Sequence, residues 1–468
     1  MISRIARKEF LELTRDGRYR ILAGVVLVLS LLSLAVGWNN YSSLSKQHET
    51  AQAATRTQWL AQDKKNPHSA AHYGMYAFKP KSQLAMVDTG IDPYVGVAVW
   101  MEAHKQNDFK FRPAQDRTAV QRFGEMTGAE VLQVLLPLFV VLMTFSAFTA
   151  EREQGTLRQL MSLGVSPRML ALGKAAGVAL ALAIVLVPAT VLGVVAFMWT
   201  TESGLLAGDA GRVAWMIAVY LVYFATLIAI GLAVSAATRS SRVSLLVLLA
   251  FWFANSLLAT RAAADLAGAL HPTPSAVQFQ RALEEDLSDQ QAVAQRLEVR
   301  RAALFKEHNV DHVDALPIAF SGISLQEGEE HANEVFDEHF GRLFNLYEQQ
   351  NRVLQAAGMA APMLAVRSLS MGLAGTDFNQ HRDFVAAAEN YRRDIQRVLN
   401  ADIAANQKKG QVYLADRSLW EQVPEFEYTA PPTQWVLGNY ITSLIVLIAW
   451  FAASAFVLFR STARLQVD

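Results

Sequence analysis

Histidine is the residue type whose spacing first suggests chemistry in this chain of 468 residues. His68 and His72 are four positions apart, so a helix would present both imidazoles on one face, as a pair of zinc ligands requires. A second group combines histidine with carboxylates: His308, Asp311, His312 and Asp314. Neither group contains a complete ligand set, and histidine is also common on solvated helices. The sequence alone therefore assigns no metal ligand.

Nucleotide binding is the second chemistry to consider. The phosphate-binding pattern G-x-x-x-x-G-K-[ST] is missing, because the run Leu172, Gly173, Lys174 continues with Ala175 and lacks the glycine loop. The chain has no cysteine, which excludes disulfides, cysteine nucleophiles and thiolate metal sites. Its formal net charge is zero, and it has no basic patch of the kind that binds nucleic acid. We expect no catalytic residue, no bound cofactor and no nucleic-acid partner.

A pair of carboxylates followed by glycine and threonine is the most informative motif. Glu151 and Glu153 precede Gly155 and Thr156. We expect the chain to turn at Gly155 and to begin a short helix that Thr156 caps. Glu151 and Glu153 could instead be ordinary charges at a helix end, but their combination with glycine and threonine favours a specific motif.

The short helix after this turn would carry apolar side chains along one face. They are Leu157, Leu160 and Met161, and the loop then continues through Pro167 and Arg168. We interpret this face as a surface on which a soluble partner could push.

Apolar residues make up 52% of the chain, which favours a membrane protein. They are concentrated in six blocks, each near the roughly 20 residues that a helix needs to cross the bilayer. The predicted spans are 21–38, 131–150, 175–199, 213–236, 243–258 and 435–459. The first block is too long for the core of a cleaved signal peptide, so we expect a retained span.

The spans contain essentially no charged side chains or histidine, so no proton relay is visible. A secondary carrier is therefore disfavoured, and energy would have to arrive from outside the spans. Pro188 would either kink the third span or mark a moving element. Four polar or amphipathic residues in the otherwise apolar spans are expected to form interhelical hydrogen bonds, with a substrate path as the less common use: Tyr220, Tyr223, Asn255 and Asn439.

The distribution of Lys and Arg among the short loops predicts the orientation. Basic residues gather in residues 1–20, 151–174 and 460–468, whereas the short loop 200–212 offers only Arg212. Both termini are then cytoplasmic, and two large segments, 39–130 and 259–434, lie outside. All ten histidines fall in these two outer segments.

The larger outer segment is predicted to be mainly helical, because apolar residues recur at helical spacing. We expect three helices, with stripes formed by Phe336, Phe340, Leu343, Tyr347 and Leu354, by Phe384, Ala388, Tyr391, Ile395 and Val398, and by Leu283, Leu287, Ala294, Leu297 and Leu304. In the smaller segment the helix of the first span should continue outward. Proline and glycine beyond Lys65, including Pro113, predict short irregular elements there.

The 151–168 loop resembles the coupling segment in permeases of type V, ABC-2-like ABC exporters, where an acidic-x-acidic-x-Gly-Thr run opens the helix that docks into the ATPase. The first residues resemble the family's amphipathic connecting helix, because they place Ile2, Ile5, Ala6, Phe10 and Leu13 on one stripe. Residues 66–74 and 77–80 resemble a bacterial subfamily of these permeases with large extracytoplasmic insertions.

The fold class implied is an all-α membrane protein with six transmembrane helices and two large extracytoplasmic insertions. Its expected domains are the connecting helix 1–20, the outer domains 39–130 and 259–434, the coupling loop 151–174 and the tail 460–468. The resemblance also implies location in a bacterial inner membrane.

The function implied is that of the permease subunit of an ATP-driven exporter for an amphipathic substrate. The expected partners are a separate ABC ATPase that holds ATP and Mg²⁺, a second permease copy or paralogue, the lipid bilayer and a periplasmic protein. One alternative is a mechanotransmitting or scaffolding complex that moves its outer domains without transport. A membrane-anchored sensor is a weaker alternative.

Overall fold

The computed structural model describes residues 1–110, 112, 126–200 and 206–465. Pro113 lies outside the described residues, as do parts of the short loop 200–212 and of the tail 460–468.

Within the described residues, six helical segments are long and apolar enough to cross a membrane. They are Gly17–Leu60, Gly128–Glu153, Pro167–Trp199, Ala210–Ala237, Ser241–Leu270 and Ile441–Ala463. Six apolar helices are thereby confirmed, but the sixth begins at Ile441 and not at residue 435, because a separate short helix ends at Asn439. The element bounds are α2 Gly17–Leu60, α7 Gly128–Glu130, η2 Val131–Leu135, α8 Leu136–Thr144, α9 Thr149–Glu153, α11 Pro167–Thr200, α12 Leu206–Ala237, α13 Ser241–Phe253, η3 Ala254–Leu258, α14 Ala259–Leu270 and α22 Ile441–Ala463.

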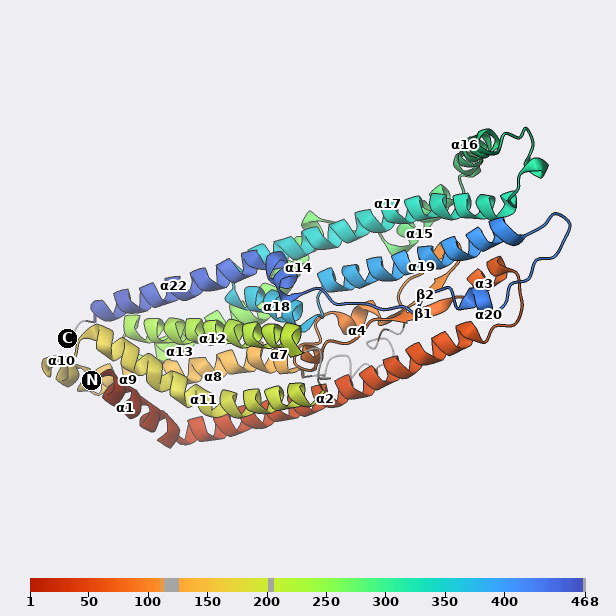
Figure 1. Cartoon of the computed structure of the whole chain (residues 1–468). Coiled ribbons are helices and arrows are strands. Elements are labelled where there is room, and N and C mark those ends of the chain that lie inside the picture. The colour runs from red at the N-terminus through yellow and green to blue at the C-terminus, as the bar shows by residue number, and fades with distance from the viewer. Residues whose placement is uncertain (111, 113–125, 201–205, 466–468) are drawn as a thin grey trace.

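The molecule is elongated, and both termini lie at the same end (Figure 1). This terminal end also contains α1 (Ile2–Arg15), α9 and α10 (Thr156–Ser162). The helix α2 begins here and extends unbroken over 44 residues toward the opposite end, a length of roughly 66 Å at 1.5 Å per residue. It confirms that the helix of the first span continues well beyond its apolar block.

The core of the membrane bundle is built around α12. Tyr223 and Leu232 on this helix are completely buried, and the core also receives side chains from α8, α11 and α22. A further contribution comes from α18 (Pro362–Ala374), whose Leu369 and Leu373 join the same cluster. The predicted outer segment 259–434 therefore contains a helix that packs onto the spans, which its chain position alone did not indicate.

The opposite end of the molecule, here called the distal domain, is formed by residues 39–110 and 271–434. Its elements are α3 Pro67–Tyr73, β1 Met75–Phe78, η1 Gln83–Met86, α4 Asp92–Val95, β2 Ala98–Glu102, β3 Lys105–Gln106, α15 Ala276–Leu287, α16 Gln290–His308, η4 Val313–Ala315, α17 Phe320–Ala357, α19 Phe378–Asn406 and α20 Arg417–Trp420. Two helices, α18 and α21 (Thr433–Asn439), contribute side chains to the core of the membrane bundle instead. The short elements after Lys65 match the irregular region predicted there.

A hydrophobic cluster joins the two segments of the distal domain. Trp59 and Trp420 are both completely buried, and the indole nitrogen of Trp59 donates a 3.0 Å hydrogen bond to the Trp420 carbonyl oxygen. Phe384 of α19 lies in the same cluster. The two predicted outer segments thus share one core.

Two details differ from the sequence-based expectation. The chain is predominantly helical, but β1, β2 and β3 form a small antiparallel sheet in which Tyr76 pairs with Trp100. The third predicted helical stripe is divided into α15 and α16. The helix is interrupted at Asp289. The carboxylate of this residue accepts hydrogen bonds from the backbone nitrogens of Gln291 and Ala292 and so caps the N-terminus of α16.

Candidate coupling site and membrane cavity

The turn between α9 and α10 depends on Gly155. Its φ of +73° lies in the left-handed region, which glycine enters without steric cost. The expected turn at this residue is confirmed. Thr156 does not cap α10, however, because its hydroxyl instead donates a 3.2 Å hydrogen bond to the carbonyl oxygen of Glu151. The threonine therefore ties the new helix back to the end of α9.

Glu151 is the centre of an ion cluster in which Glu151, Glu9 and Lys174 are buried and Lys8 is exposed. Its Oε1 lies 2.9 Å from Lys8 Nζ on α1 and 3.0 Å from Lys174 Nζ on α11. Lys174 Nζ also lies 2.8 Å from Glu9 Oε2. These contacts connect α1, α9 and α11 through charged groups that would be costly to leave unpaired.

Neighbouring charges in this cluster act on the pKa values of Glu9 and Lys8. Burial raises the pKa of Glu9, and the nearby Lys174 ammonium opposes that shift. Burial acts to lower the pKa of Lys8, but its hydrogen bond and attraction to Glu151 raise it overall. The cluster thus links the N-terminal helix electrostatically to the bundle.

The next two residues of the motif contact the turn between α12 and α13. Arg152 donates hydrogen bonds to the carbonyl oxygens of Thr238 and Ala236. Glu153 Oε1 accepts a 2.7 Å hydrogen bond from the backbone nitrogen of Ser241, and Oε2 accepts one of 3.0 Å from its hydroxyl. The end of the second span therefore contacts α1 and α11 on one side and the α12–α13 turn on the other. A movement of α10 would displace several spans.

The exposed face of α10 differs from the predicted one. Leu157 is 2% exposed and belongs to the bundle core, so it is not available to a partner. Leu160 and Met161 are half-buried. The large apolar side chain that α10 exposes to solvent is Leu163, at its C-terminal end, with 76% of its surface accessible.

Charged and polar residues accompany Leu163 on this surface. Arg158, Gln159 and Ser162 are exposed on α10, Arg168 is exposed at the start of α11, and Pro167 is half-buried as the first residue of α11. Leu163 follows the predicted apolar stripe at i+3 from Leu160, a helical spacing that could have identified it.

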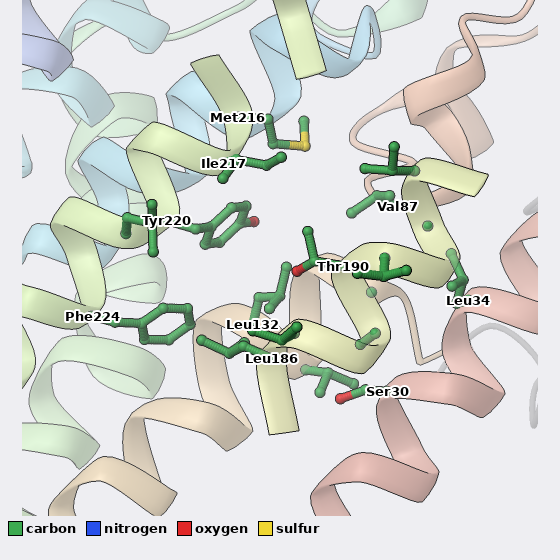
Figure 2. Close-up of a pocket in the computed structure, with 18 of the residues that line it drawn as sticks. Ser30, Leu34, Val87, Leu132, Leu186, Thr190, Met216, Ile217, Tyr220 and Phe224 are labelled. Atoms are coloured by element: carbon green, nitrogen blue, oxygen red, sulfur yellow. The ribbon is translucent and has the colours of Figure 1, made fainter. Parts of the chain in front are cut away.

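A cavity of about 540 Å³ lies between the spans. Figure 2 shows Tyr220 and Phe224 of α12 on one side, Leu186 and Thr190 of α11 at the centre, and residues of α2 on the other side. Its lining is mainly aliphatic and aromatic, and η1 closes part of it near Met86.

The polar groups around the cavity are largely paired with protein. Ser30 and Ser33 donate hydrogen bonds to carbonyl oxygens of their own helix. The Tyr220 hydroxyl is 2.9 Å from both the Gln133 amide nitrogen and the Ser370 hydroxyl. The cavity is therefore suited to an apolar chain or ring.

The other polar residues noted in the spans mostly bond between helices, as expected. The Asn255 side chain accepts a 3.1 Å hydrogen bond from the backbone nitrogen of Met363, and its amide nitrogen lies 3.4 Å from the Tyr223 hydroxyl. Asn439 is exposed. Pro188 lies within an uninterrupted α11.

Among the described residues, one group of three histidines has ligand nitrogens close enough to share a metal ion: His68, His72 and His104. The group around His312 does not converge in this way. Asp314 instead pairs with Lys409 at 2.6 Å on the surface.

Two family models match the chain. Residues 94–255 match the ABC-2 family transporter protein model. This match supports an ABC-2-like permease, a membrane component that works with a separate ATPase partner. Residues 276–429 match a domain of unknown function, DUF3526, which comprises most of the second segment of the distal domain. No curated protein matches the chain.

Proposed function

We propose that this chain is the permease subunit of a type V ABC exporter and that α10 transmits the movements of a separate ABC ATPase to the spans. The observation that carries the proposal is the ion cluster around the buried Glu151, directly before α10, within a segment that matches the ABC-2 model. A force applied to α10 would reach α1 and α11 through Glu151, and the α12–α13 turn through Glu153.

The cavity supports an amphipathic cargo. It is lined mainly by apolar side chains of four spans, and a substrate with an acyl chain or an apolar ring could bury that part there. Two copies, or this chain and a paralogue, would stand above two ATPase subunits, as the resemblance to type V exporters implies. In that arrangement the distal domain lies in the periplasm and receives cargo or a periplasmic partner.

The ATPase interface can be tested with a matched pair of surface variants. Leu163→Asp places a charge on the exposed face of α10, and Val299→Asp makes the same kind of change at a 67% exposed position on α16 in the distal domain. The complex is purified in mild detergent, and vanadate-sensitive ATP hydrolysis is measured per permease. We expect Leu163→Asp to lose most of the associated ATPase activity and Val299→Asp to keep it. The proposal would be contradicted if no ABC ATPase copurified with the native chain. It would also be contradicted if Leu163→Asp and Val299→Asp retained the same ATPase activity.

A mechanotransmitting complex is a second candidate, and the length of the helices favours it. The unbroken α2 connects the terminal end to the core of the distal domain, where Trp59 near its C-terminus is completely buried. A stiff helix of this kind could transmit a displacement over its whole length. The two candidates differ in flux: an exporter moves an amphipathic molecule between leaflets or across the bilayer during ATP turnover, whereas a mechanotransmitter moves its distal domain without flux.

A further inference from the structure

Three imidazoles converge on the surface of the distal domain. His68 and His72 lie on α3, and His104 lies in the tight turn that joins β2 to β3. The ring centroids are 4.7 Å apart for His68 and His72, and 5.1 Å apart for each of the other two pairs. The ligand nitrogens of the three residues all lie within 4.8 Å of one another.

These separations are close to those of a metal site. A zinc ion binds imidazole nitrogen at about 2.0 to 2.1 Å, so two nitrogens of a tetrahedral site are about 3.3 Å apart. The Nε2 atoms of His68 and His72 are 3.2 Å apart. Small side-chain rotations would bring the third imidazole to the same spacing.

A buried carboxylate orients the third histidine. Glu329 Oε1 lies 2.6 Å from His104 Nδ1, and the same carboxylate accepts hydrogen bonds from the His104 backbone nitrogen. With Nδ1 donating to Glu329, Nε2 is the nitrogen that remains for a metal. A carboxylate that bonds the second nitrogen of a ligating histidine is the common outer support of zinc sites.

Glu329 is itself held firmly in place. It is 1% exposed, it belongs to α17, and Arg392 of α19 lies 3.4 Å from its Oε2. Arg392 in turn pairs with Glu389 at 2.7 Å. The support for His104 therefore comes from the second segment of the chain, whereas all three imidazoles come from the first.

The backbone conformation of His104 is a further indication that this residue has a functional role. Its φ of +63° places a residue other than glycine in the left-handed region, a conformation that costs energy and clusters at functional sites. The turn and the carboxylate together aim the ring toward His68 and His72.

We propose that His68, His72 and His104 bind a zinc ion, with Glu329 as the positioning residue for His104. Neutral imidazoles are preferred zinc ligands, and three of them leave a fourth position open for water or an exogenous ligand. His72 and His104 are exposed and His68 is half-buried, so the fourth position faces solvent. Because Glu329 comes from a separate segment, zinc binding would also strengthen the junction between the two segments of the distal domain.

Zinc binding is measured on the full chain in detergent, purified without a polyhistidine tag. Elemental analysis gives the stoichiometry, and competition with a chromophoric chelator gives the affinity. We expect one zinc ion per chain and a higher unfolding temperature when zinc is added. Replacing zinc with Co²⁺ should give the intense visible absorption of a four-coordinate site.

The variants distinguish this site from general histidine binding. Glu329→Gln should weaken zinc binding by roughly 10- to 100-fold, as removal of such an outer support does. His72→Ala and His104→Asn should weaken it further, and asparagine tolerates the left-handed backbone of the turn. His312→Ala removes an exposed histidine outside the group and should leave the affinity unchanged.

Two results would overturn the proposal. One is a native chain that binds no more zinc than the combined variant His68→Ala, His72→Ala and His104→Asn. The other is an equal loss of affinity in His312→Ala and His72→Ala, because both residues are exposed and neither substitution should impair folding. A site that takes Cu²⁺ but not zinc at these histidines would overturn the choice of ion.

Discussion

Lys174 Nζ on α11 lies 2.8 Å from Glu9 Oε2 on α1, and both residues are buried. The contact spans 165 positions in the sequence and brings the amphipathic N-terminal helix against the start of the third span. Together with Glu151 it connects the proposed ATPase-facing end to the membrane bundle.

Loss of the Lys174 charge should destabilise the bundle. Lys174→Met leaves the buried carboxylates of Glu9 and Glu151 with a missing partner, and breaking such a cluster costs roughly 3 kcal/mol in the free energy of unfolding. Denaturant unfolding in detergent measures the effect. Lys306→Met, at an exposed position of α16, is the matched control and should change stability by less than about 0.5 kcal/mol.

A second substitution separates charge from packing. Adding Glu9→Gln to Lys174→Met should recover part of the lost stability, because a neutral amide no longer requires an ammonium partner. No recovery would mean that Lys174 stabilises the bundle through its packing instead.

Gly37 should be essential for the close contact between α2 and η1. A Cβ at this position would overlap the carbonyl oxygen of Met86, which belongs to the backbone and cannot move cheaply. Gly37→Ala should therefore cost about 1 to 3 kcal/mol in the free energy of unfolding. Gly24 lies on the same helix with open space around its Cα, so Gly24→Ala should be neutral or stabilise the protein by up to about 1 kcal/mol. Equal effects of the two changes would show that the close contact is not needed.

Asp92 should make the distal domain sensitive to acid. Burial acts to raise the pKa of Asp92, but the ammonium groups of Lys79 and Lys81, at 2.7 Å and 3.0 Å, lower it from 3.8 to about 2. A carboxylate with a lowered folded-state pKa contributes stability that is present above its unfolded pKa and lost as pH falls through its folded pKa. The native chain should therefore lose about 2 kcal/mol of stability between roughly pH 4 and pH 2.

Chemical denaturation across this pH range, followed by near-ultraviolet circular dichroism, measures the loss. Asp92→Asn removes the titrating group, so its stability should decline less over the same range. A parallel decline in both proteins would show that other groups account for the acid sensitivity.

Filling the membrane cavity should exclude lipid-like ligands. A side chain at Gly193 on α11 would enter space bordered by Leu34 at 3.9 Å. Gly193→Phe should reduce cross-linking of a photoactivatable phospholipid to the peptide that contains residues 179–197, measured in nanodiscs by mass spectrometry. Gly24→Phe, outside the cavity lining, is the control and should label like the native chain. Unchanged labelling of Gly193→Phe would argue against occupation of the cavity by an acyl chain.

The sequence predicts the helices well because each span is a local pattern of about 20 apolar residues. The helical stripes with Phe336 and Phe384 were likewise predicted correctly, as parts of α17 and α19. The division between α15 and α16 was missed, since the apolar spacing continues across it. Asp289, a common capping residue, was the signal that could have located it.

The sites were less predictable because they depend on contacts between distant residues. The sequence identified Glu151 and Glu153 as a motif, but nothing in the local pattern connects Glu151 to Lys8 and Lys174. In the same way, the pair of His68 and His72 was recognised while His104 was not. Its approach depends on the pairing of β2 with β1 and on a carboxylate from α17.

The most direct test of the central claim measures whether ATP hydrolysis by the partner rearranges the spans. The chain has no cysteine, so a pair of spin labels can be introduced specifically at Leu32 on α2 and Ile445 on α22. Both positions are exposed, and their helices lie on opposite sides of the bundle (Figure 1). Pulsed electron paramagnetic resonance then compares the nucleotide-free complex with the complex trapped by ATP and vanadate. A shifted distance distribution that disappears in Leu163→Asp is the predicted result, whereas an unchanged distribution in a complex that hydrolyses ATP would contradict the coupling of the ATPase to these spans.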